Sequence, residues 1–129
     1  MFAIHSTDDG RALPLEYMTA MAGFPVTIGG TLTCITGGKL QPCEEGGVPS
    51  YIAMAECGEL SEDKIVPVVR IQKDVVFETE TSIEELEVGE KLAITDTGKE
   101  LKRGTADDTG VFEVTWVGEN GEVRGRFVV

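Results

Sequence analysis

The sequence has little of what enzymatic chemistry usually requires. Only one of the 129 residues is histidine, His5, and only 6% of the residues are aromatic. A serine or cysteine nucleophile needs a neighbouring base, and the sequence offers no second histidine to complete a catalytic triad. The low aromatic content also disfavours a platform on which a ligand ring would stack. We therefore predict no catalytic residues and no enzymatic activity.

Basic residues are also scarce. Eleven Lys and Arg residues against 23 Asp and Glu residues give a formal net charge of −12. Proteins bind nucleic acids and anionic membranes largely through basic side chains, so the composition predicts neither partner. No apolar run is long enough to span a membrane, and residues 1–10 lack the basic and apolar regions of a signal peptide. We therefore expect no secretion by a signal peptide.

The three cysteines do not have the spacing of a metal site. Cys34 and Cys43 are nine residues apart, and Cys57 follows fourteen residues later. Structural zinc sites usually pair their ligands at gaps of about two to four residues, and the sole histidine lies far away at His5. We predict reduced thiols, no metal ligands and no cofactor.

The acidic and glycine doublets also give no site. The acidic doublets are Glu44-Glu45, Glu84-Glu85 and Asp107-Asp108, and the glycine pairs are at 29–30, 37–38 and 46–47. Adjacent residues on a strand point to opposite faces, so no acidic doublet forms a ready-made acid–base pair. No glycine pair precedes a helix with the Lys-Ser or Lys-Thr of a nucleotide-binding loop, and hairpin turns explain the pairs better. No catalytic, cofactor-binding or metal-binding residue is predicted.

What the sequence does contain is strand patterning, clearest in residues 110–129. Phe112, Val114 and Trp116 alternate with polar or smaller side chains, the turn 118–121 contains an Asn-Gly pair, and residues 122–129 alternate again. This pattern predicts a half-buried antiparallel hairpin with the only tryptophan on its apolar face. The predicted core residues are Trp116, Phe112, Phe127, Phe77 and Ile71.

Similar patterns predict about eight to ten short strands and therefore an all-β fold. They include a hairpin that turns at Gly37-Gly38 and a strand at 64–73, in which Pro67 indicates an edge or a bulge. Residues 82–87 could form a single helical turn. We predict a small closed or partly open β-barrel for residues 24–129 as one domain, with a β-sandwich as the alternative.

Residues 1–23 are predicted to form an N-terminal arm. Its first twelve residues look weakly ordered, so we expect their deletion to spare folding. The rest of the arm is either extended or a short helix that begins at Pro14.

Eight segments resemble small proteins encoded beside the capsid genes of tailed phages and prophages of Gram-positive bacteria. They are LPLEYM (13–18), GTL (30–32), TGGKL (36–40), PSYIAM (49–54), IVPVVRI (65–71), DVVFET (74–79), VGEKL (88–92) and GVFEV (110–114). This resemblance covers nearly the whole chain from Leu13, and it is a pattern of turns and strands without a catalytic signature.

The resemblance implies a non-enzymatic structural virion protein, made in the bacterial cytoplasm, that decorates or stabilises the outside of a phage capsid. The implied partner is the major capsid protein, and the implied assembly is a homo-oligomer, with a trimer favoured. The alternative is a small-ligand or carbohydrate-binding β-barrel module. A symmetric trimer would favour the first function, and a monomer with a deep apolar pocket would favour the second.

Overall fold

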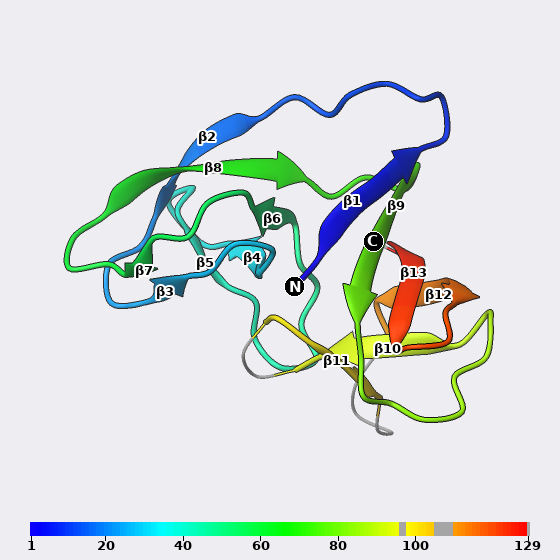
Figure 1. Ribbon diagram of the computed structural model, residues 1–129. Helices are drawn as coiled ribbons and strands as arrows, with labels where there is room; N and C mark the ends of the chain where they lie inside the picture. The colour runs from blue at the N-terminus through cyan, green and yellow to red at the C-terminus, as the bar shows by residue number, and fades with distance from the viewer. Residues whose placement is uncertain (96–97, 105–109, 129) are drawn as a thin grey trace.

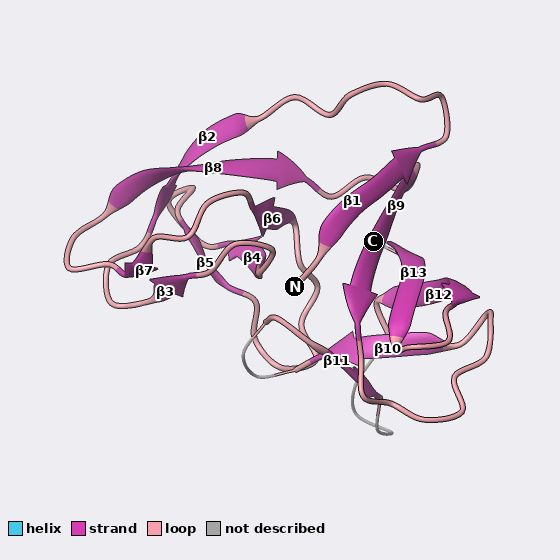
Figure 2. Cartoon of the chain, in the orientation of Figure 1, coloured by secondary structure: helices cyan, strands magenta, loops and turns pink. Residues whose placement is uncertain are grey.

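The computed structural model describes residues 1–95, 98–104 and 110–128. These residues form strands, turns and loops, with no helix among them (Figure 1 and Figure 2). The strands are β1 (Ala3–Thr7), β2 (Glu16–Ala20), β3 (Pro25–Val26), β4 (Thr31–Cys34), β5 (Leu40–Pro42), β6 (Tyr51–Ala53), β7 (Gly58–Glu59), β8 (Lys64–Arg70), β9 (Val75–Glu80), β10 (Lys91–Ile94), β11 (Leu101–Arg103), β12 (Phe112–Val117) and β13 (Glu122–Phe127). The prediction of an all-β fold is confirmed.

Five strands close into the predicted small barrel, in the order β2-β5-β4-β6-β8. Its wall is antiparallel except between β2 and β5, where Ala20 and Leu40 pair in parallel. Apolar side chains from all five strands fill the interior, and Leu40 and Val68 have no exposed surface. The β4–β5 hairpin turns at Gly37 and Gly38, whose φ angles of 93° and 77° explain the glycine pair.

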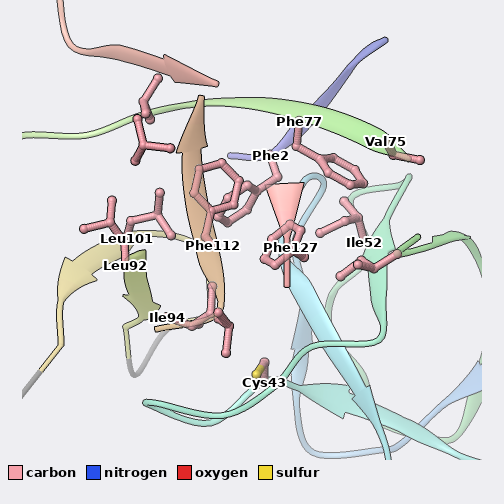
Figure 3. Packing of buried hydrophobic residues seen from close by; sticks show 14 of the residues in the cluster. Phe2, Cys43, Ile52, Val75, Phe77, Leu92, Ile94, Leu101, Phe112 and Phe127 are labelled. Carbon is pink, nitrogen blue, oxygen red and sulfur yellow. The ribbon is translucent and has the colours of Figure 1, made fainter. Parts of the chain in front are cut away.

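A six-stranded antiparallel sheet lies beside the barrel, in the order β1-β9-β13-β12-β10-β11. Its inner face carries a cluster of aromatic rings (Figure 3). The ring centroid of Phe127 lies 5.4 Å from that of Phe77 and 5.2 Å from that of Phe112. These three residues and Ile71 are buried, as predicted. The strands β3 and β7 form a separate two-stranded ribbon.

The inner face of the sheet packs against the outside of the barrel. Ile52 of β6 and Val69 of β8 are paired in the barrel wall, yet both side chains belong to the core cluster of the sheet. Backbone hydrogen bonds join the two parts as well, from the Thr31 N–H to the Gly98 carbonyl oxygen at 2.9 Å and from the Gly46 N–H to that of Ile94 at 3.0 Å. The barrel exterior and the sheet therefore share one core.

The segment 1–23 is extended and takes part in both sheets, rather than forming a free arm. Strand β1 pairs with β9, and β2 pairs with β8 as part of the barrel wall. The side chain of Phe2 is 2% exposed, and its ring centroid lies 5.3 Å from that of Phe127. The prediction of weak order is wrong for residues 2–7, because strand pairing and the burial of Phe2 fix them. Figure 1 shows the N-terminus between the barrel and the sheet.

Trp116 is not a core residue, contrary to the prediction. In the β12–β13 pair, Val114 lies opposite Gly125 and Trp116 lies opposite Arg124, with a register shift between them. A bulge adds one residue to a strand, so the side-chain alternation reverses beyond it. Trp116 is therefore 40% exposed on the outer face of the sheet, whereas Val114 is buried.

Two local predictions also need correction. The register of β8 with β2 is regular through Pro67, and β8 lies within the barrel wall rather than at an edge. Pro67 faces the chain just beyond the end of β6, where its carbonyl oxygen accepts a hydrogen bond from the Met54 N–H at 3.0 Å. No ladder donor is needed at that position, so the proline is tolerated. Residues 82–87 form bends without a helical turn, and Glu85 has a positive φ of 57°.

Candidate functional site

The thiols and the histidine lie apart from one another. Cys43 is buried in the core cluster of the sheet, Cys57 is half-buried beside the barrel core, and Cys34 is exposed. Burial raises the pKa of the Cys43 thiol from 9.0 to about 11. His5 is exposed on β1, where its Nδ1 lies 3.0 Å from the Ser6 hydroxyl oxygen. Within the described ranges, no group of three or more His, Cys, Asp or Glu residues is placed to hold a metal ion.

Many of the carboxylates are used in surface ion pairs. Glu16 and Arg70 join β2 to β8 through two hydrogen bonds of 3.1 and 2.9 Å. The Arg70 guanidinium holds the pKa of the Glu16 carboxyl below its ordinary value of 4.5. Similar pairs link Arg124 to Glu78 at 2.8 Å, Arg126 to Asp8 at 2.6 Å and Arg103 to Glu90 at 2.7 Å. These pairs connect strands and loops.

The acidic doublets have structural surroundings where they are described. Glu45 pairs with Lys102 at 2.5 Å, which links the loop after β5 to β11. The backbone carbonyl oxygens of Glu84 and Glu85 accept hydrogen bonds from Arg103 at 2.9 and 3.2 Å. The doublet Asp107-Asp108 lies outside the described residues.

The glycine pairs serve backbone packing and turns. A Cβ atom on Gly29 would lie 2.9 Å from the carbonyl oxygen of Phe2, and the Phe2 N–H donates to the Gly29 carbonyl oxygen at 2.9 Å. Gly46 donates its N–H to Ile94, as described above, and the Gly47 N–H bonds the Glu44 carbonyl oxygen at 2.9 Å. The pair at 37–38 forms the β4–β5 turn. None of these pairs precedes a helix in the described structure.

The exposed tryptophan is held by its neighbours on the outer face of the sheet. The guanidinium carbon of Arg124 lies 4.1 Å from the centroid of the Trp116 ring system, and Arg124 also pairs with Glu78. At the benzenoid edge of the indole, a Cβ atom on Gly118 would approach Trp116 Cη2 to 2.8 Å. With one face covered by a cation and one edge against backbone, this indole is a poor platform for a sugar ring.

Two depressions of the described surface contain charged residues. One depression of about 310 Å³ is lined by Lys73, Glu113, Thr115, Arg126, Phe127 and Val128. Its cation Arg126 is already bonded to Asp8 and, at 3.1 Å, to the Lys73 carbonyl oxygen. Another of about 320 Å³ is mainly polar and lies around Glu80 and Glu100. Both are open to solvent rather than enclosed, unlike a deep ligand pocket.

Fold and surface together define the class of protein. It is an all-β protein in which a closed five-stranded barrel is joined to a six-stranded sheet. Among the described residues, no helix is long and apolar enough to cross a membrane.

No protein-family model and no curated protein sequence matches the chain. Among solved structures, the chain is similar to the N base of the head fiber gp8.5 of bacteriophage phi29. The TM-score is 0.61 and the sequence identity is 15%, with 88% of this chain and 94% of that chain covered. The two proteins therefore share a fold over nearly their whole lengths.

Proposed function

We propose that this chain is a non-enzymatic structural protein of a phage virion, located on the capsid. The observation that carries the proposal is the common fold with the base of a phage head fiber, which extends over 88% of this chain. The sequence resemblance to proteins encoded beside the capsid genes of tailed phages supports the same assignment.

Within this proposal, the protein binds the outside of the shell as a head-decoration or capsid-stabilising protein, and its partner is the major capsid protein. The net charge of −12 supports an outer position, since a strongly acidic protein is repelled by packaged DNA. A trimer would match a position where three capsid subunits meet.

The charge is unevenly distributed along the chain, which bears on how such a protein would be oriented. Residues 14–73, which contain all barrel strands, carry seven acidic and four basic residues. The remaining residues carry sixteen acidic and seven basic residues. The net charge is therefore −3 for the barrel segment and −9 for the rest. The barrel side is accordingly the better candidate for contact with other virion proteins.

The ligand-binding alternative has less support. The barrel interior is filled by its own apolar side chains, and Leu40 and Val68 leave no exposed surface there. The only tryptophan is covered on one face by Arg124. A barrel that binds a small ligand inside needs an open interior, which this filled barrel does not provide.

The composition of purified particles tests the proposed function. Virions of the phage or prophage that encodes the chain are banded by density and analysed by quantitative mass spectrometry. We expect the chain in the full-particle band at a constant ratio to the major capsid protein, with immunogold label on heads. Its absence from washed particles, with the chain recovered only in the soluble lysate, would refute a virion role.

A further inference from the structure

An apolar surface lies on the outside of the barrel, on the strands β2 and β8. Along β8, Val66 and Val68 point into the barrel and are buried. Ile65, which precedes Val66 in the same strand, is 64% exposed. On β2, Tyr17 is 68% exposed. Strand alternation places these large side chains on the solvent side of the barrel wall.

The register shows that these side chains are neighbours. Tyr17 lies directly opposite Pro67, and the Met54 N–H bonds the Pro67 carbonyl oxygen at 3.0 Å on the other side of β8. Tyr17, Pro67 and Met54 therefore form a row across the barrel wall. Ile65 lies two residues before Pro67 on the same face, opposite Thr19. With Leu15, which is 47% exposed and precedes Tyr17 by two residues, they form the β2–β8 patch: Leu15, Tyr17, Met54, Ile65 and Pro67.

The β2–β8 patch continues the interface between the barrel and its own sheet. Ile52 lies two residues before Met54, and Val69 lies two residues after Pro67, so all four belong to the outer face of the same wall. Ile52 and Val69 are each 1% exposed because the six-stranded sheet covers them. The sheet thus covers one part of this apolar wall and leaves the other part open, at the end of the molecule where β2 and β8 lie side by side (Figure 1).

Charge favours a second copy of this chain as the occupant of the patch. The whole chain has a net charge of −12, so most contacts between two copies would be repulsive. The two strands that carry the patch hold only Glu16, Lys64 and Arg70 as charged residues, a net charge of +1. Glu16 and Arg70 already neutralise each other. Two copies that meet through these strands bring together surfaces of low net charge.

We propose that the β2–β8 patch is the surface through which copies of this chain contact one another. The inference rests on the proposed function in that such contacts would form between copies gathered on a shell. The patch consists of five side chains, whereas each partner in a standard interface contributes about 20–30 residues and ~800 Å². The contact is therefore weak in dilute solution and forms at high protein concentration, as on a capsid.

Two matched substitutions test this assignment in the full-length protein. Ile65→Glu places a charge in the patch, and Val88→Glu places the same charge at a side chain of similar exposure, 66%, on the loop between β9 and β10. Sedimentation velocity is measured over a dilution series that spans the µM to mM range of weak contacts.

The wild-type protein and Val88→Glu should show a weight-average mass that rises with concentration. Ile65→Glu should lose association by about tenfold or more, because like charges would face each other in the contact. Added salt should strengthen wild-type association, since it screens the repulsion between acidic molecules and leaves the apolar contact intact.

Two results would overturn the assignment. One is equal weakening of association by both substitutions, and the other is a wild-type protein that stays monomeric at the highest concentration. If such a monomer binds heads and only Ile65→Glu loses that binding, the patch contacts the capsid protein instead. The proposed function can fail separately from this inference. If self-association depends on Ile65 but the protein is absent from virions, the patch is confirmed as a self-contact and the virion role is refuted.

Discussion

Phe2 is the residue that ties the beginning of the chain to the core. Its ring centroid lies 5.7 Å from that of Phe112 and 5.3 Å from that of Phe127, and its backbone N–H is bonded to Gly29 of the barrel segment. One residue thus contacts both parts of the molecule. Burial of a complete aromatic side chain at such a junction contributes a large part of the free energy of unfolding of a small domain.

Phe2→Ala should lower the free energy of unfolding by about 3 kcal/mol or more, through lost apolar burial and the cavity left between the rings. Urea unfolding followed by circular dichroism measures this change. Ile4→Ala is the matched control on the same strand, because Ile4 is 36% exposed and is expected to contribute much less. Equal small effects of the two substitutions would contradict the placement of Phe2 in the core.

The three thiols should differ in reactivity in the order of their exposure. Cys34 is exposed, Cys57 is half-buried and Cys43 is 1% exposed. The pKa of Cys43 is raised to about 11, which leaves the unreactive thiol form at neutral pH. We expect a chromogenic disulfide reagent to label Cys34 quickly, Cys57 more slowly and Cys43 only after unfolding. Rapid labelling of three thiols in the native protein would contradict this order.

The raised pKa of Cys43 also predicts that the free energy of unfolding falls at alkaline pH. A group whose folded pKa is raised contributes its stability below its unfolded pKa, here 9.0, and the contribution is lost as pH rises toward about 11. The native state should therefore weaken in this range, and Cys43→Ala should show less of that dependence than the wild type. Unfolding curves collected across this window measure the difference.

At the scale of elements, ion pairs fasten strands that are distant in sequence. Glu16 and Arg70 join β2 to β8 beside the patch, while Arg11 binds Asp9 and Asp74 and so fixes the turn between β1 and β2 near the start of β9. The Arg11 guanidinium lowers the pKa of Asp74, and Arg70 lowers that of Glu16. Exposed pairs of this kind act more on local geometry than on total stability.

The dependence of the free energy of unfolding on acidic pH tests the Glu16–Arg70 pair. Because the folded pKa of Glu16 lies below 4.5, its contribution is present above that pH and is lost as pH falls through the lowered value. Glu16→Gln should therefore show a shallower loss of stability below pH 4.5 than the wild type. Glu62→Gln, an exposed carboxylate with no ion pair among the described residues, should match the wild type. Parallel profiles for wild type and Glu16→Gln would contradict the role of the pair.

Local patterns were enough to predict many elements. The β4–β5 hairpin, the final β12–β13 hairpin and the buried side chains Phe77, Phe112 and Phe127 follow from alternation and glycine turns. Trp116 was misplaced because a bulge of one residue reverses the side-chain alternation, and composition gives no sign of it. The bulge therefore also decided which aromatic residue reached the surface.

At the scale of the whole molecule, the sequence predicted a barrel but not its partner sheet. Separating a five-stranded barrel from a six-stranded sheet requires knowledge of which strands pair, and these pairings are distant in sequence. The pairing of β1 with β9 joins residues more than sixty positions apart, so the N-terminal segment looked free when its partner was unknown. The exposed β2–β8 patch was equally hidden, because Ile65 has the pattern of an ordinary strand residue, and Leu15 and Tyr17 lie in a segment that could be extended or helical.

The uneven charge of the molecule agrees with its proposed place on a capsid. The barrel segment, with a net charge of −3, carries the apolar patch, and the more acidic remainder carries the sheet. An assembly that gathers the barrels would direct the acidic sheets outward, where mutual repulsion keeps particles apart in solution.

The most direct test of the proposed function is rebinding to capsids that lack the protein. Heads from a phage deleted for this gene are mixed with increasing amounts of the purified full-length protein, sedimented and analysed for bound copies per capsid subunit. The proposed function predicts saturable binding at a fixed ratio and label confined to the outer surface in electron micrographs. Binding that never saturates, or heads that remain bare at all concentrations, would contradict it.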